Sequence, residues 1–226
     1  MALVGLILTF AAPVVAKYLR RSRDLSAIST MTRYLNQSRL QAVKRGFNVC
    51  VQFSKGAADP SNPKFEKRII MSSWEDRNPD FLLGTYVDAV GVTQNEVNLG
   101  SVQVETAVHL AKPGGTDDDI DSNVLFKTYG GDTSLKGLVV FTPTGGIVPP
   151  EAGDCGTPTL ADGRAIYFGD APSATDVTPS NTNENWNFFR VTIVSNLSGK
   201  PREEMLIKPR TGDTRDGYYP TDWKWK

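Results

Sequence analysis

The sequence has few of the side chains from which catalytic and metal sites are usually built. It contains one histidine, His109, and only two cysteines, Cys50 and Cys155. Two cysteines are too few for a zinc site of their own, and a single histidine leaves few general bases. The chain also has no G-x-S-x-G, no H-E-x-x-H, no phosphate-binding glycine loop and no C-x-x-C pair. We therefore predict no enzymatic activity, no cofactor and no small-molecule substrate.

The state of the two cysteines is left open by the sequence. A disulfide between Cys50 and Cys155 would suit an oxidising compartment, and two separate thiols are the equal alternative. Cys50 lies in the alternating segment Phe47–Phe53. Its side chain should therefore point away from the apolar face of that predicted strand.

Charge is balanced in total but divided along the chain. The 25 basic and 25 acidic residues cancel, yet residues 1–16 carry no charge, residues 17–46 carry a net +7 and residues 47–226 carry −7. This division argues against a protein that coats nucleic acid. Basic residues directly after an apolar segment suit the anionic head groups of lipids instead.

The first sixteen residues form an apolar run with Thr9 as its one hydroxyl side chain. As a helix the run would span roughly 24 Å, which is short of the ~30 Å hydrocarbon core of a bilayer. A cleaved signal peptide is disfavoured because no Lys or Arg precedes the run. A buried core helix would need burial on all sides. A membrane anchor that lacks its first turns fits best, with Pro13 kinking the helix or removing one hydrogen bond.

An amphipathic helix should follow this run and end at Gly46. Apolar positions recur close to every 3.5 residues, at Leu19, Leu25, Ile28, Met31/Thr32, Leu35 and Ala42. Gly46 suits the position just after a helix end, with Lys44 and Arg45 in the last turn. We therefore divide the chain into a helical part, residues 1–46, and a β-rich domain, residues 47–226.

The β-rich domain should consist of short strands separated by turns. After the alternating segment at 47–53 we predict strands near 68–74, 81–87, 96–109, 123–128, 137–142, 164–169, 187–195 and 203–208. Residues 147–163 and 170–186 have the composition of exposed loops. The aromatic tail, residues 218–226, should dock on the domain.

The N-terminal segment resembles a known family. Gly5, Pro13 eight residues later, and Tyr18 within a basic segment are spaced as in the N-terminal helix of type IV pilins. The family's leader peptide, its glycine cleavage site and the acidic residue of its first mature turns are missing, so we expect further residues before Met1. The resemblance implies a membrane and assembly helix with the key residues Leu3, Gly5, Leu6, Leu8, Phe10, Pro13 and Tyr18.

Three later motifs narrow this resemblance. Residues 40–53 around Gly46, residues 138–146 with a Phe-x-Pro-x-Gly turn, and residues 189–202 are similar to minor pseudopilins of the general-secretion H subunit and FimT-like group. The resemblance implies an α+β fold in which a long N-terminal helix packs on an antiparallel β-sheet. It also implies a subunit of a type II secretion or type IV pilus machine, with N-terminal methylation of the processed prepilin.

The same resemblance implies partners and a location. The partners would be other pilins or pseudopilins, with secreted cargo or DNA as further ligands. The chain would cross the bacterial inner membrane once, with its β domain in the periplasm or on the filament surface. Two alternatives stay open: a FimT-like minor pilin that binds DNA for uptake, and a membrane-anchored binding domain that never assembles.

Two clusters of charge are candidates for ligand binding. FimT-like pilins carry a C-terminal G-R-x-R segment associated with DNA capture, and Lys200 and Arg202 stand at its two cationic positions here. Lysine does not match the fork of donors of the arginine it replaces. Asp117, Asp119 and Asp121 offer alternate carboxylates of the kind that Ca²⁺ prefers, but no EF-hand spacing follows. A solvated acidic loop is the favoured interpretation of that cluster.

Overall fold

The structure is a computed structural model, and it describes residues 2–55, 68–78, 85–105, 138–148, 165–169, 188–193, 195, 197–207 and 224–225. Within its helix, side chains are described at positions 12, 14, 15, 18, 19, 22 and 23 and from 25 onward. Statements about the fold below refer to these residues. The predicted strand at 123–128 lies outside them.

One long helix, α1, spans Ala2–Arg45. It ends where the sequence predicts, because Gly46 has a left-handed backbone with φ of 74°. The Gly46 N–H donates to the carbonyl oxygen of Ala42 over 3.0 Å, which satisfies one of the last free helix carbonyls. Lys44 and Arg45 place positive charge at the negative end of the helix dipole.

A first antiparallel sheet follows the helix. It consists of β1 (Asn48–Lys55), β2 (Arg68–Asp76), β5 (Val97–Glu105) and β6 (Leu138–Phe141), in the spatial order β5-β2-β1-β6. The register places Cys50 opposite both Trp74 and Val140. Between β2 and β5 the register shifts at Ser73/Trp74, which marks a bulge next to Gly100.

A second antiparallel sheet is built from the C-terminal part of the chain. It contains β7 (Ala165–Gly169), β8 (Phe188–Ile193), β9 (Pro201–Ile207) and β10 (Lys224–Trp225), in the order β10-β9-β8-β7. The pairing of β10 with β9 confirms that the tail docks on the domain at these two residues. A separate two-stranded ribbon consists of β3 (Thr85–Val87) and β4 (Thr93–Asn95).

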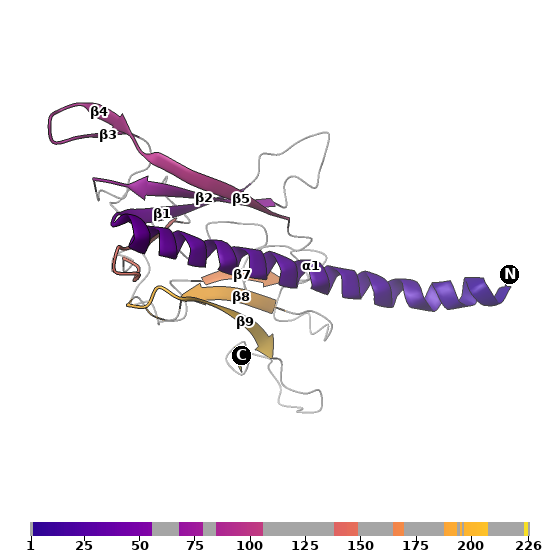
Figure 1. Cartoon of the computed structure of the whole chain (residues 1–226). Coiled ribbons are helices and arrows are strands. Elements are labelled where there is room, and N and C mark those ends of the chain that lie inside the picture. Colours follow the sequence, from indigo (N-terminus) through magenta and orange to yellow (C-terminus); the bar gives the residue numbers. More distant parts are fainter. Residues whose placement is uncertain are drawn as a thin grey trace, which may run out of the picture.

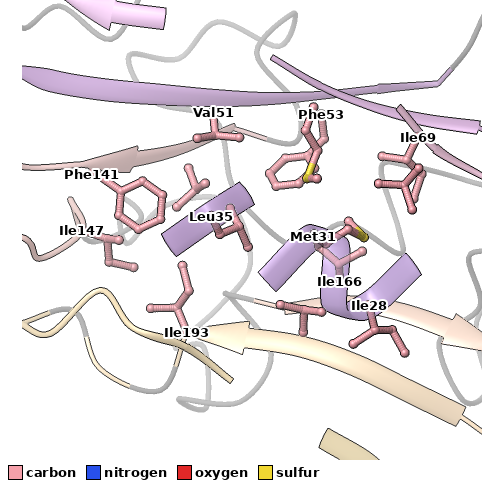
Figure 2. Close-up of a cluster of buried hydrophobic side chains, with 14 of the residues drawn as sticks. Ile28, Met31, Leu35, Val51, Phe53, Ile69, Phe141, Ile147, Ile166 and Ile193 are labelled. Carbon is pink, nitrogen blue, oxygen red and sulfur yellow. The ribbon is translucent and has the colours of Figure 1, made fainter. Parts of the chain in front are cut away.

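The C-terminal half of α1 lies between the two sheets and contacts strands of both (Figure 1). Its buried residues are spaced three and four apart, at Ile28, Met31, Leu35, Ser38 and Ala42. Figure 2 shows three residues of this stripe, Ile28, Met31 and Leu35, facing Val51, Phe53 and Phe141 of the first sheet and Ile166 and Ile193 of the second. The apolar area removed from water on both sides of the helix stabilises the domain by about 25 cal/mol per Å².

The α+β class is confirmed, with one helix packed on antiparallel sheets. The prediction of a single sheet was incomplete, because the helix contacts two four-stranded sheets. Among the α1 side chains that the structure describes, Leu19 and Leu25 of the predicted stripe are exposed and Ala27 is the first that is buried. Seven predicted strands are found with shifted ends. Of the predicted strand at 81–87 the structure describes residues 85–87, which form β3, and β4 was not predicted.

Candidate functional site

The N-terminal part of α1 projects beyond both sheets, and we call residues 2–26 the arm (Figure 1). At about 1.5 Å per residue the arm extends roughly 37 Å. Every arm side chain that the structure describes is exposed, and Tyr18 has 71% of its surface accessible. The exposed apolar side chains of the arm are Val14, Val15, Tyr18, Leu19 and Leu25. A contiguous apolar surface of this kind marks an interaction site.

The arm contains the residues that are predicted to act in membrane insertion and assembly. Their backbone is helical at Leu3, Gly5, Leu6, Leu8, Phe10 and Pro13. Tyr18 is the one of the predicted set whose side chain is described, and it is exposed.

Among the described residues, no helix contains a stretch long and apolar enough to cross a membrane.

The packed half of α1 is fixed to the first sheet by two hydroxyl contacts. The Tyr34 hydroxyl donates to the carbonyl oxygen of Gly100 over 2.7 Å, at the bulge of β5. The Ser38 and Ser73 hydroxyls lie 2.6 Å apart in the buried interface, and Ser38 also donates to the Tyr34 carbonyl. Burial raises the pKa of the Tyr34 hydroxyl, and its hydrogen bonding to Ser73 offsets part of that effect.

The C-terminal end of α1 is held by a buried carboxylate. Glu75 on β2 has only 1% of its side chain exposed and accepts from Arg45 Nη1 at 2.8 Å and from Arg77 Nε at 2.7 Å. The hydrogen bond to Glu75 is the main reason that the pKa of Arg77 is raised. Arg77 also lies over the Phe47 ring, 5.4 Å from its centroid. These contacts hold the C-terminal end of α1 against the first sheet.

Two of the sequence motifs, residues 138–146 and 189–202, meet beside the helix. The turn after β6 is closed by hydrogen bonds between Thr142 and both Gly145 and Gly146. The carbonyl oxygen of Gly145 accepts from Arg39 Nε over 2.8 Å. Gly199 packs on the same turn so closely that a Cβ there would lie 2.5 Å from the Gly145 oxygen. Arg39 of α1, the turn after β6 and the turn before β9 are therefore in contact with one another.

The predicted DNA-binding residues lie on the second sheet, away from the arm. Lys200 and Arg202 are both exposed, the first just before β9 and the second within it. Arg202 Nε lies 3.5 Å from Oε1 of Glu204. The other oxygen of that carboxylate, Oε2, accepts from Arg190 Nε at 2.5 Å. The neighbouring carboxylates of Glu203 and Glu204 weaken the positive potential that a phosphate backbone requires.

The structure leaves the predicted cation site and disulfide untested. Asp117, Asp119, Asp121 and Cys155 lie outside the described residues. Among the described residues, no group of three or more metal-ligating side chains comes together. Cys50 is buried but is not part of the core cluster, and its Sγ lies 3.9 Å from Asp76 Oδ2, which agrees with the predicted orientation.

The ribbon of β3 and β4 is a second exposed apolar feature, and sequence reasoning missed it. Val87, Val90 and Val92 are exposed around its turn, with 83% of Val90 accessible. A signal was present in the sequence, because Asp88 and Gly91 stand three apart in a short valine-rich segment, as in a tight turn.

Comparison with known proteins gives no further assignment: no family model, curated protein or solved structure matches the chain.

Proposed function

We propose that this chain is a pilin-like filament subunit, a minor pilin or pseudopilin of a type II secretion or type IV pilus machine, which assembles through its arm. The observation that carries the proposal is the division of one continuous helix into a half that packs against two sheets and a half whose described side chains are all exposed. A helix that served only the core of its own domain would have no use for the exposed half.

Assembly would bury the arm against the arms of neighbouring copies. Fully burying one side chain of the size of Val or Leu contributes about 1.5–3 kcal/mol, so a few arm residues suffice to drive association. The contacts of Glu75, Arg39 and Tyr34 hold the packed half of α1 in the domain. The arm therefore leaves each domain in a fixed direction, which a regular filament requires.

Before assembly, the arm would rest in the bacterial inner membrane. The basic residues that follow the apolar run would face anionic head groups, and the β domain would lie in the periplasm. These basic residues are Lys17, Arg20, Arg21 and Arg23. After extraction, the same arm would form the filament interior and the two sheets would form its surface.

Two matched substitutions on α1 test this proposal. Val14 in the arm and Leu40 in the packed half have similar exposed fractions, 68% and 61%. Val14→Asp should weaken self-association of the full chain in mild detergent at least ~10-fold, because a buried carboxylate without a partner costs more than 1.4 kcal/mol. Leu40→Asp should leave association unchanged. Sedimentation velocity measures both.

The same experiment separates the alternatives. Equal association by Val14→Asp and Leu40→Asp would show that the arm is not the assembly surface. A wild-type chain that stays monomeric but binds vesicles of anionic lipid would favour the membrane-anchored binding domain. Salt-dependent binding of duplex DNA that is lost in Arg202→Ala would favour the DNA-binding minor pilin.

A further inference from the structure

The ribbon of β3 and β4 has a preorganised turn. Oδ1 of Asp88 accepts the backbone N–H groups of Val90 and Val92 at 3.1 and 2.9 Å, and its Oδ2 accepts the side-chain amide of Gln94 at 3.2 Å. The Asp88 N–H donates to the Val92 carbonyl, and Gly91, with φ of 82°, donates to the Asp88 carbonyl. The turn is thus held by hydrogen bonds made within the ribbon itself.

The turn presents an apolar surface that its own domain does not use. Val87, Val90 and Val92 are exposed together, and residues 85–95 contain only one charged side chain, Asp88. Three exposed valines on a preorganised turn cost little conformational entropy when a partner covers them. The ribbon therefore has the properties of a docking element for an apolar partner.

The position of the ribbon identifies that partner. Figure 1 shows the ribbon beyond the C-terminal end of α1, whereas the arm leaves the domain at the opposite end. Copies that follow one another in the same orientation along the helix axis bring the arm of one copy to the ribbon of the next. Two different surfaces that fit each other at opposite ends form a head-to-tail contact, and such contacts produce open filaments.

Charge agrees with this pairing. The arm carries four basic residues and one acid, a net +3, while residues 47–226 carry −7. The backbone N–H of Val92 is the main cause that lowers the pKa of Asp88, and the side-chain amide of Gln94 and the backbone N–H of Val90 lower it further, so the turn keeps its negative charge at neutral pH. A basic arm is thus attracted to the acidic domain of another copy and to the ribbon that projects from it.

We infer that the ribbon, through Val87, Val90 and Val92, docks on the exposed apolar side chains of the arm of a second copy of this chain. The inference rests on the proposed function, since it names the surface that receives the arm. The contact between ribbon and arm would be additional to the contacts between the arms of neighbouring copies. The head-to-tail geometry also makes each subunit both donor and acceptor of one such contact.

Photo-crosslinking from the ribbon tests the inference directly. A photoreactive benzoylphenylalanine replaces Val90 in the full chain, and isotopically heavy and light chains are mixed so that bonds between copies can be recognised by mass spectrometry. The expected result is a crosslink from position 90 to residues 2–26 of the other copy. The same probe at Leu197, which is 90% exposed on the turn before β9, serves as the control and should not reach the arm.

A pair of substitutions measures the strength of the contact. Val90→Lys removes apolar surface and places a cation against the basic arm, so the association constant should fall at least ~10-fold. Leu197→Lys should change it less than ~2-fold. Both positions are exposed, so circular dichroism and melting temperature should match those of the wild-type chain.

The outcomes distinguish this inference from the proposed function. If Val14→Asp weakens association but position 90 crosslinks elsewhere or Val90→Lys associates normally, the ribbon contact is wrong and arm assembly stands. If Val14→Asp has no effect on association, both are overturned. A crosslink from position 90 to the arm together with the effects of Val14→Asp and Val90→Lys supports both.

Discussion

Arg39 on α1 donates from Nε to the carbonyl oxygen of Gly145 over 2.8 Å, and this bond joins the helix to the turn that follows β6. Gly199, from the turn before β9, packs against the same carbonyl. One backbone oxygen is therefore shared by the helix and by turns of both sheets. Its surroundings are too close-packed to admit another side-chain atom.

The first prediction follows from this crowding. Gly199→Ala should lower the free energy of unfolding by about 2–4 kcal/mol, because the new Cβ would meet the Gly145 oxygen in addition to the strain of a positive φ. Gly91→Ala is the matched control, since its φ is also positive and nothing lies within 4 Å of a Cβ there. That change should cost only about 1 kcal/mol. Urea denaturation compares the two, and equal losses would contradict the packing argument.

The second prediction concerns the carboxylate at the end of α1. Glu75→Ala removes the hydrogen-bond partner of both Arg45 and Arg77 and should destabilise the domain by about 1.5–3 kcal/mol, because bonds to a charged group are lost while both arginines stay partly hydrated. Arg45→Ala should cost about 1 kcal/mol, because Arg45 is half exposed and Arg77 still neutralises Glu75. Thermal unfolding of the two variants checks this order, and a larger loss for Arg45→Ala would refute it.

The third prediction addresses the buried serine pair between α1 and β2. Ser38→Ala leaves the Ser73 hydroxyl without this partner, and Ser73→Ala does the reverse, so each should cost about 1–2 kcal/mol. The double variant should cost less than the sum of the two, by about 0.5–1.5 kcal/mol. A double-mutant cycle in urea measures this coupling, and strict additivity would show that the contact contributes nothing.

The fourth prediction concerns the pH dependence of the ribbon. Asp88 holds the turn as a carboxylate, and its pKa in the folded chain lies below the ordinary value of 3.8. Its contribution is therefore complete above pH 3.8 and is lost as the pH falls through the lower folded pKa. Amide exchange and chemical shifts at Val90 and Val92 should change only in that acidic range. In Asp88→Asn the same signals should not show this transition.

The sequence predicted local structure well where one residue determines the backbone. Gly46 ends α1 because a glycine accepts the left-handed conformation that closes the helix. Alternation around Cys50 predicted which residues of β1 face the core, because successive side chains of a strand point to opposite sides. These are short-range effects, so they can be read from a few neighbouring letters.

Neighbouring residues could not predict how much of the helical stripe is buried, nor that a second sheet packs on it. Leu25 and Ile28 belong to the same heptad pattern, yet Leu25 is exposed and Ile28 is buried. Helical periodicity shows which face of a helix is apolar, but it does not encode how far along the helix that face is covered by distant strands. The ribbon was missed because its two strands are only three residues long and its turn depends on the side chain of Asp88.

The sequence alone determined that this protein has a long helix with an apolar start, a break at Gly46 and a β-rich remainder, because propensity, periodicity and charge act over neighbouring residues. The tertiary structure decided which half of α1 is covered and which half projects as the arm. It also brought Arg39, Gly145 and Gly199 to one point, although they lie far apart in the chain. These outcomes depend on how two sheets pack around one helix, and packing is a property of surfaces that distant segments form together.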